Sequence, residues 1–191
     1  MLAYVFWHWP RPYIPPEEYE WRLAGFHKWL NEDRPAGVQR SCTWRIEHAS
    51  WLPQGLAYED WYLLDDSRAL DVINTAAVSG ALHTLHEPIA ALAAGGTAGL
   101  YKPARVSRAA VSAAFAVWFA KPDDMSYAHL YSVLDAIETA PAARLWQRML
   151  VLGPTPEFCL LQEEGGSPLP EGWPSSTVER SPVWPLPPEP Q

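Results

Sequence analysis

Positive charge is scarce in this sequence. Its 191 residues contain 14 Lys and Arg against 22 Asp and Glu, which gives a formal net charge of −8. A nucleic-acid surface needs clustered cations that release counterions from the phosphates, and no such cluster is present. The composition therefore excludes DNA and RNA as main partners.

Long apolar runs and cysteines are also few. The first apolar stretch meets Pro10, well short of the ~20 residues that a membrane-spanning helix needs. The alanine-rich stretch 76–94 carries two histidines, a glutamate and a proline, which are too polar for a bilayer. The two cysteines, Cys42 and Cys159, do not form a disulfide framework and are expected as buried free thiols. We expect a soluble, cytoplasmic chain with no membrane partner.

The familiar catalytic motifs are missing as well. The sequence has no G-x-S-x-G, Walker, G-x-G-x-x-G, C-x-x-C or H-E-x-x-H pattern. The glycine-rich "AAGGTAG" follows an expected helix and lacks the lysine of a phosphate-binding loop. We expect no cofactor. His83 and His86 lie one helical turn apart, a spacing at which two imidazoles can meet one cation, but a structural or capping role is favoured over a metal site.

Aromatic and apolar residues are abundant, at 13% and 48% of the chain, which is enough for a large core. Proline stops an apolar strand at Pro10, and a helix follows in which Tyr19, Leu23, Phe26 and Leu30 recur at helical spacing. Two strands, a second helical region and a closing strand come next, over 38–48, 58–65, 66–96 and 98–103. This β-α-β-β-α-β order predicts a ferredoxin-like unit.

The remaining sequence partly repeats this unit. "AAFAVWFAKPDDMSYAHLYSVLDAI" mirrors "LAYVFWHWPRPYIPPEEYEWRLAGF". The alignment matches Trp7 with Trp118, Trp44 with Trp146, and Leu63-Leu64 with Leu160-Leu161. "GGSPLPEGWPSS" is expected as a loop in place of a helix, and "TVERSPVW" as a closing strand. We therefore predict an α+β chain with a ferredoxin-like repeat at 1–106, a truncated repeat at 107–185 and a proline-rich tail at 186–191.

Both faces of the predicted first strand are apolar. Tyr4 and Phe6 lie on one face, and Val5 and Trp7 lie on the other. An isolated ferredoxin-like sheet would leave one face in water and would alternate apolar with polar residues. We therefore expect the two sheets of the chain to pack face to face.

Five stretches carry a resemblance to a known superfamily: "AYVFWHWP", "YEDWYLLDDSRALDVI", "GLYKP", "AVWFAKP" and "EFCLLQEE". With them the chain resembles the dimeric α/β-barrel superfamily, here fused in tandem. That superfamily includes antibiotic-biosynthesis-type monooxygenases without cofactors, polyketide cyclases, haem enzymes acting on dyes and chlorite, and stress-responsive proteins. The resemblance implies a barrel with an apolar small-molecule pocket, as a monomer that forms an internal pseudo-dimer or as a homodimer, and it leaves the reaction open.

Polar residues present in only one repeat are the candidates for chemistry. His8 aligns with Phe119, and Arg45 aligns with Gln147. A buried histidine can act as a general base near neutral pH, or it can be a core residue with one satisfied hydrogen bond. If the protein is an enzyme, we predict His8 as the base or hydrogen-bond donor and Arg45 as the group that steadies a developing oxyanion. Arg45 shares a strand face with Glu47, and the favoured alternative is that it forms a solvated or interdomain ion pair.

The substrate-binding candidates share aromatic or imidazole rings near these positions: Tyr4, Phe6, Trp61, Tyr62, His83 and His86. Glu59 and Asp60 have acidic or polar counterparts in the alignment, so they are interpreted as turn and cap residues. His27 is expected at a solvent-exposed helix edge.

These features predict a protein that binds a small apolar or aromatic molecule. The reaction would be a cofactor-independent oxygenation, isomerisation or cyclisation. The alternative is a non-catalytic stress-responsive or interaction protein whose tryptophans are all packing residues. A haem enzyme ranks third, because the best axial candidate, His8, lies on a crowded strand.

Overall fold

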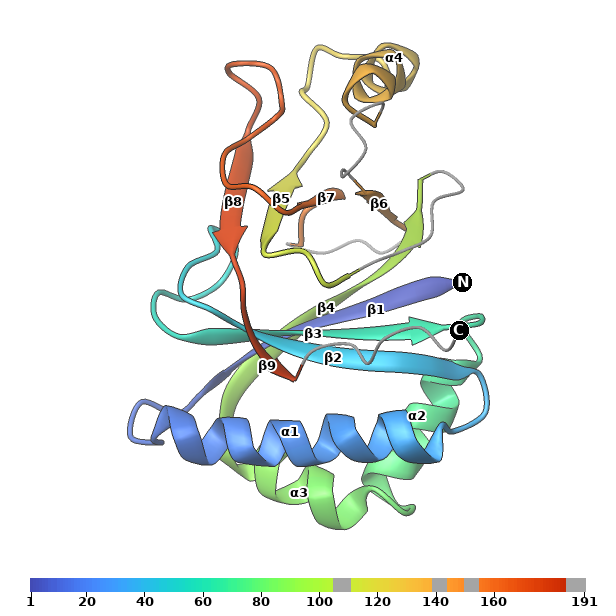
Figure 1. Cartoon of the computed structure of the whole chain (residues 1–191), viewed down its shortest axis with the longest axis vertical. Helices are drawn as coiled ribbons and strands as arrows, with labels where there is room; N and C mark the ends of the chain where they lie inside the picture. Colours follow the sequence, from blue (N-terminus) through green and yellow to red (C-terminus); the bar gives the residue numbers. More distant parts are fainter. Residues whose placement is uncertain (105–110, 139–143, 150–154, 185–191) are drawn as a thin grey trace.

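The computed structural model describes residues 1–104, 111–138, 144–149 and 155–184 (Figure 1). Its helices are α1 (Pro16–Asp33), α2 (Ala69–Val78), α3 (His83–Leu92) and α4 (Tyr127–Glu138). Its strands are β1 (Leu2–Pro10), β2 (Val38–Ile46), β3 (Ala57–Leu64), β4 (Ala93–Pro103), β5 (Phe115–Phe119), β6 (Arg144–Arg148), β7 (Phe158–Gln162), β8 (Ser175–Glu179) and β9 (Ser181–Trp184). The predicted boundary between repeats and the predicted tail at 186–191 lie outside the described residues.

The strands form one antiparallel sheet in the order β8-β5-β7-β6-β4-β1-β3-β2-β9. We expected two separate sheets packed face to face; the strands instead form one continuous sheet, and the inner faces of its two halves share one core. Backbone pairing between β4 and β6, with Tyr101 opposite Arg148, joins the two groups of strands edge to edge. Within each group the order is the same, since β4-β1-β3-β2 corresponds to β8-β5-β7-β6.

The two ends of this sheet are adjacent in the chain. β8 pairs with β5 at one end and β9 pairs with β2 at the other, and Arg180 alone separates β8 from β9. Figure 1 shows the chain running from β8 directly into β9. The predicted closing strand in "TVERSPVW" is therefore present, but it is divided into two pieces that reach different neighbours.

Helices cover the outer face of the sheet. α1, α2 and α3 lie together against β1 to β4, whereas α4 lies with the other group of strands (Figure 1). No helix occurs between β7 and β8, where the sequence predicts a loop. Gly95 and Gly96 do not end a helix as expected but lie inside β4. Position 96 requires glycine because a Cβ atom there would come within 2.5 Å of the Phe6 ring.

The opposite face of the sheet encloses a tryptophan-rich core. Alternate residues of β1, including Val5 and Trp7, join Trp118 and Trp146 from the other group of strands in one buried cluster. Both faces of β1 are therefore packed, as its sequence predicts. The two cysteines are buried free thiols, as expected.

One buried ion pair lies within this core. Arg180 Nε is 3.0 Å from Glu59 Oε1, and both side chains are fully buried. The indole N–H groups of Trp7 and Trp61 donate to the two carboxylate oxygens of Glu59, at 2.9 and 2.7 Å. The Arg180 guanidinium also donates to two backbone carbonyls and lies 4.2 Å from the Trp44 ring centroid. These contacts hold the link between β8 and β9 inside the core.

We predict that Arg180→Met lowers the free energy of unfolding by about 3–5 kcal/mol, because it leaves the Glu59 carboxylate buried without a counter-charge. Urea unfolding measures this loss. The double variant Glu59→Leu with Arg180→Met should recover part of it, since no buried charge is left. Arg68→Ala, which removes an exposed ion pair with Asp66, is the control and should leave stability unchanged. An Arg180→Met protein as stable as the wild type would contradict the prediction.

Candidate active site

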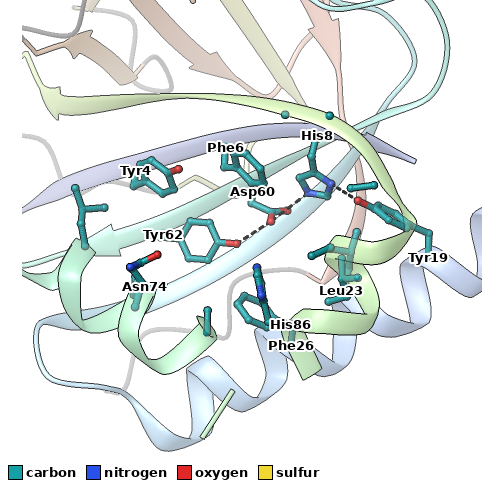
Figure 2. A pocket seen from close by; sticks show the side chains of 18 of the residues that line it. Tyr4, Phe6, His8, Tyr19, Leu23, Phe26, Asp60, Tyr62, Asn74 and His86 are labelled. Atoms are coloured by element: carbon teal, nitrogen blue, oxygen red, sulfur yellow. Dashed lines mark hydrogen bonds and ion pairs between the residues drawn. The ribbon is translucent and has the colours of Figure 1, made fainter. Parts of the chain in front are cut away.

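A cavity of about 680 Å³ lies between the sheet and helices α1, α2 and α3 (Figure 2). This volume falls in the roughly 300–1,000 Å³ range of small-molecule sites. The strands β1, β3 and β4 form one wall, and the three helices form the other. The lining residues are Tyr4, Phe6, His8, Tyr19, Leu23, Phe26, Asp60, Tyr62, Leu70, Asp71, Ile73, Asn74, Ala77, His86, Ile89, Ala90, Ala93, Ala94, Gly95 and Gly96.

The strand period brings three rings of β1 to this wall. Tyr4, Phe6 and His8 alternate with the core residues of β1, so their side chains all face the helices. The ring centroids of Phe6 and His8 are 5.1 Å apart, and the two ring planes are inclined to each other by 23°, so the rings are stacked. Gly95 and Gly96 leave room for the Trp9 and Phe6 rings over β4. The result is an aromatic surface that suits a flat apolar ligand.

A chain of polar contacts crosses the floor of the cavity (Figure 2). His8 Nδ1 lies 2.8 Å from the Tyr19 hydroxyl, and His8 Nε2 lies 3.2 Å from Asp60 Oδ2. The Tyr62 hydroxyl donates to the same Asp60 oxygen at 2.8 Å. His8 and Asp60 are each only 2% exposed. Both ring nitrogens of His8 therefore face protein groups.

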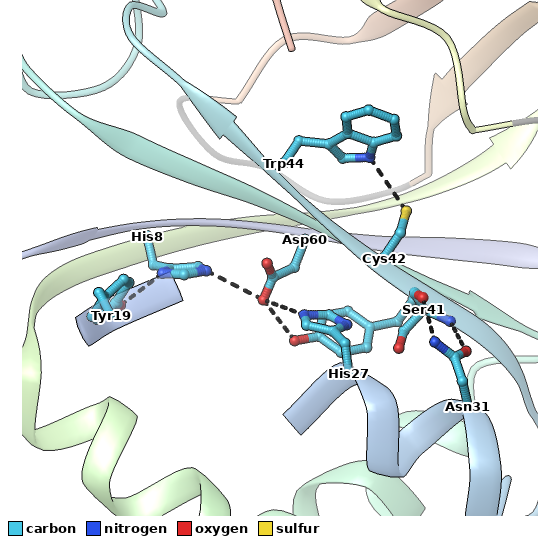
Figure 3. A network of polar contacts seen from close by, with 9 residues as sticks. His8, Tyr19, His27, Asn31, Ser41, Cys42, Trp44 and Asp60 are labelled. Carbon is cyan, nitrogen blue, oxygen red and sulfur yellow. Dashed lines mark hydrogen bonds and ion pairs between the residues drawn. The ribbon is translucent and has the colours of Figure 1, made fainter. Parts of the chain in front are cut away.

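A second histidine approaches Asp60 from α1 (Figure 3). His27 is fully buried, and its Nε2 lies 3.3 Å from Asp60 Oδ2. Asn31, one helical turn further along, fixes this part of α1 on β2: its side-chain amide bonds both the N–H and the C=O of Ser41, each at 2.8 Å. The helix therefore has little freedom to move His27 away from the carboxylate.

Burial and charge shift the pKa values of this group. Burial alone would raise the pKa of Asp60, but the electrostatic interactions and hydrogen bonds with His8 and His27 outweigh burial, and the pKa of Asp60 lies well below 3.8. Burial and the Asp60 charge raise the pKa values of Tyr19 and Tyr62. Burial lowers the pKa of His86 at the cavity wall. Asp60 is thus a carboxylate, and the two tyrosines are neutral phenols.

The structure brings five of the predicted site residues to this cavity: Tyr4, Phe6, His8, Tyr62 and His86. His86 also lies near Phe26, with ring centroids 6.1 Å apart. The five residues line one cavity, as residues of a single site must, and their functional roles remain predictions.

Three predicted residues lie elsewhere. Arg45 Nε donates to Glu20 Oε1 at 2.6 Å, so its guanidinium forms an ion pair with α1 outside the cavity. Trp61 follows Asp60 in β3 and points into the opposite core, because successive strand residues face opposite sides. His83 is exposed at the start of α3. The proposed oxyanion role of Arg45 therefore has no basis at this cavity.

Three titratable residues lie in other surroundings than we expected from the sequence. Glu59 and Asp60 are not turn or cap residues but lie inside β3, fully or almost fully buried. His27 is not at a solvent-exposed edge. A signal was present for the acids, because "YEDWYLL" places two carboxylates within an otherwise apolar strand, where each would need a buried partner.

Pairing register explains the mistake about the acids. Glu59 lies opposite both Trp7 and Trp44, whereas Cys159 lies opposite both Trp118 and Trp146. By register, Asp60 therefore corresponds to Leu160. The predicted match of Leu63-Leu64 with Leu160-Leu161 is wrong by an odd number of residues, which exchanges the two faces of the strand.

Among the described residues, no group of three or more His, Cys, Asp or Glu side chains could hold a metal ion. Among the described helices, none combines the length and the apolar character needed to cross a membrane.

Solved structures resemble this chain over almost its whole length. An inferred monooxygenase from Fusobacterium nucleatum gives a TM-score of 0.56 at 10% identity, covering 95% of this chain and 92% of that one. An inferred monooxygenase from Lactobacillus acidophilus gives 0.54 at 9% identity, covering 97% and 95%. An inferred chlorite dismutase gives 0.51 at 10% identity, covering 95% of each chain. The chain shares their fold.

This likeness confirms the predicted ferredoxin-like α+β class and carries no more than the fold, because the identities are low. No protein-family model and no curated protein matches the sequence.

We predict that Asp60→Asn lowers the free energy of unfolding by about 3–5 kcal/mol near neutral pH, because the buried side chains of His8 and His27 lose the carboxylate that they both contact. The pKa of Asp60 is depressed in the folded state, so its stabilisation is present above the ordinary value of 3.8 and is lost as the pH falls below it. Urea unfolding measured from neutral pH to below pH 3.8 should therefore show the free energies of unfolding of the two proteins converging in acid. Asp65→Asn, at the exposed end of β3, is the control. A difference that widens in acid would contradict the assignment.

Proposed function

We propose that the cavity binds a small apolar or aromatic molecule and that the chain Tyr19–His8–Asp60 takes a proton from it. The observation that carries this proposal is a buried histidine–carboxylate pair at the floor of an aromatic cavity of about 680 Å³. Buried polar groups of this kind cost free energy to maintain, and they gather at functional sites.

The proton path follows from the hydrogen bonds. The carboxylate of Asp60 favours the His8 tautomer with its proton on Nε2, so Nδ1 accepts the Tyr19 hydroxyl proton. When a ligand gives its proton to the Tyr19 oxygen, the Tyr19 proton passes to His8, and Asp60 stabilises the imidazolium that results. His8 thus acts through Tyr19, which differs from the direct role we predicted from the sequence.

Two reactions start from this proton transfer. The deprotonated ligand can regain a proton at another atom, which is an isomerisation, or it can react with O₂, which is an oxygenation without a cofactor. The resemblance of the sequence to antibiotic-biosynthesis-type monooxygenases and the fold shared with inferred monooxygenases support the second. Dependence of the turnover on O₂ separates them.

We also propose that the chain is a fused pair of ferredoxin-like units whose sheet closes as one α/β barrel. The repeated strand order and the direct link from β8 to β9 support this. A barrel closed within one chain needs no second copy to bury its core.

A non-catalytic binding protein is the second candidate. The observation in its favour is that both ring nitrogens of His8 lie beside protein groups, 2.8 Å from the Tyr19 hydroxyl and 3.2 Å from Asp60 Oδ2, as in a packed core histidine. The two candidates share ligand binding and differ in proton transfer.

Filling the cavity tests ligand binding. Ala77 is 5% exposed and lines the cavity from α2, whereas Thr75 is exposed on the same helix and does not line it. We predict that Ala77→Leu weakens the binding of naphthalene, measured by equilibrium dialysis, by about tenfold, or roughly 1.4 kcal/mol. Thr75→Leu should leave binding unchanged. Equal binding by the wild type and Ala77→Leu would place the ligand elsewhere.

Proton transfer is tested with 2-tetralone in D₂O, whose acidic C–H groups exchange with solvent when a base removes their protons. We predict that the wild-type protein accelerates this exchange, followed by NMR. His8→Gln should bind 2-tetralone but lose most of the acceleration, because the glutamine amide can still donate to Asp60 but cannot accept and carry the Tyr19 proton. Tyr58→Phe, a buried phenol outside the cavity whose hydroxyl bonds Glu20, is the control and should retain it. Binding by the wild type without acceleration would favour the non-catalytic candidate.

A further inference from the structure

The imidazole of His86 lines the cavity and is available to a ligand. His86 is half-buried on α3, and Figure 2 shows its ring directed into the cavity. Its side chain forms no hydrogen bond within the described part of the chain, and neither ring nitrogen belongs to the fully buried atoms that lack a partner. Phe26 packs beside it, with ring centroids 6.1 Å apart. A ligand can therefore reach the imidazole, in surroundings from which water is partly excluded.

This imidazole is neutral at neutral pH. Burial lowers the pKa of His86 from the ordinary value of 6.5 and outweighs the opposite effect of Glu87, while His83 acts in the same direction as burial. A neutral imidazole carries one N–H donor and one bare nitrogen. Its N–H group can hold and polarise a carbonyl oxygen without giving up its proton.

The proposed proton transfer requires such an oxygen in the ligand. When a C–H bond gives its proton to a base, the electron pair of that bond remains on the ligand. In an apolar or aromatic molecule a conjugated carbonyl oxygen takes up this charge, and a hydrogen-bond donor beside the oxygen stabilises it. None of the described residues that line the cavity is a lysine or an arginine, so this donor is a neutral group.

The charge of Asp60 favours one place in the cavity for this oxygen. Burial and the Asp60 charge raise the pKa values of Tyr4 and Tyr62, so the carboxylate also opposes negative charge on a ligand oxygen beside these tyrosines. Burial, Glu87 and His83 cause the pKa shift of His86, without a contribution from Asp60. An oxygen that gains negative charge is therefore better placed at His86 than at the Tyr4 hydroxyl.

We propose that the His86 N–H group donates to the carbonyl oxygen of the ligand and that the cavity thereby selects flat aromatic ketones. This inference rests on the proposed function, since it concerns the molecule that loses a proton there. The C–H bond breaks, its proton passes to Tyr19, and its electron pair moves to the carbonyl oxygen, so no oxidant takes part in this step. His86 holds the developing oxyanion, a role that we expected of Arg45 from the sequence.

Two probes of similar shape, 2-tetralone and tetralin, test the proposal on the full chain, because only the ketone has a carbonyl group. Equilibrium dialysis measures the affinity of each. We expect His86→Leu to weaken 2-tetralone binding by about fivefold, as for the loss of one hydrogen bond, and to leave tetralin binding unchanged. His86→Gln keeps an N–H donor and should retain most of the ketone affinity. His83→Leu is the matched control, since His83 is exposed on the same helix and does not line the cavity.

The carbonyl band of bound 2-tetralone gives a direct readout. With carbon-13 at the carbonyl position, infrared difference spectra report this bond alone, and a hydrogen bond to the oxygen lowers its stretching frequency. We expect the band in the wild-type complex to lie below its position in cyclohexane. It should return toward that position in His86→Leu but not in Tyr4→Phe. A wild-type band at the cyclohexane position overturns the inference even where His86→Leu fails to fold.

The outcomes separate this inference from the proposed function. Equal loss of 2-tetralone and tetralin binding in His86→Leu means that the ring only packs against ligands, and it overturns the inference. Unchanged ketone binding in His86→Leu, or a band that shifts in Tyr4→Phe instead, overturns it as well. In each of these cases the cavity remains a binding site. Failure of the wild-type protein to bind either probe refutes the proposed function and, with it, the inference.

Discussion

Two neighbouring carboxylates in β3 determine most of what is distinctive in this structure. Glu59 and Asp60 are both buried, and because successive strand residues face opposite sides, one enters the core and the other enters the helix-covered face. A buried charge is tolerated only with partners of opposite charge or with hydrogen-bond donors. Each carboxylate therefore has its own set of partners, and the two sets lie on opposite faces of the sheet.

The Glu59 side is complete, and its effect is on the architecture. Two indole N–H groups and the Arg180 guanidinium occupy both oxygens, and Arg180 is the residue at which the chain passes from β8 to β9. The same ion pair thus fixes the turn that links the two ends of the sheet. The Asp60 side is incomplete, since Oδ1 has no partner among the described residues.

Local periodicity was enough to predict much of this arrangement. The alternation in "AYVFWHWP" predicts that Tyr4, Phe6 and His8 share one face, and helical spacing predicts that Tyr19, Leu23 and Phe26 share another. These two faces do enclose the cavity. The partners of Arg45 and His27 could not be predicted in the same way. Glu20 and Asp60 belong to other elements, and no spacing within one segment reports the distance between segments.

The two halves of the chain correspond residue by residue only when their strands are aligned in the register that the backbone pairing gives. Trp7 with Trp118 and Trp44 with Trp146 lie at matching positions, and His8 with Phe119 follows from the same register. A misaligned leucine pair hid the fact that the second half has Cys159 and Leu160 where the first has Glu59 and Asp60. With apolar residues there, the corresponding outer face packs Phe119 and Leu160 against Leu130 and Leu134 of α4, and the described residues of this cluster are all hydrophobic. The polar site is therefore confined to the half that has two carboxylates in its central strand, and a strand alignment checked for parity would have singled out Asp60 from the sequence.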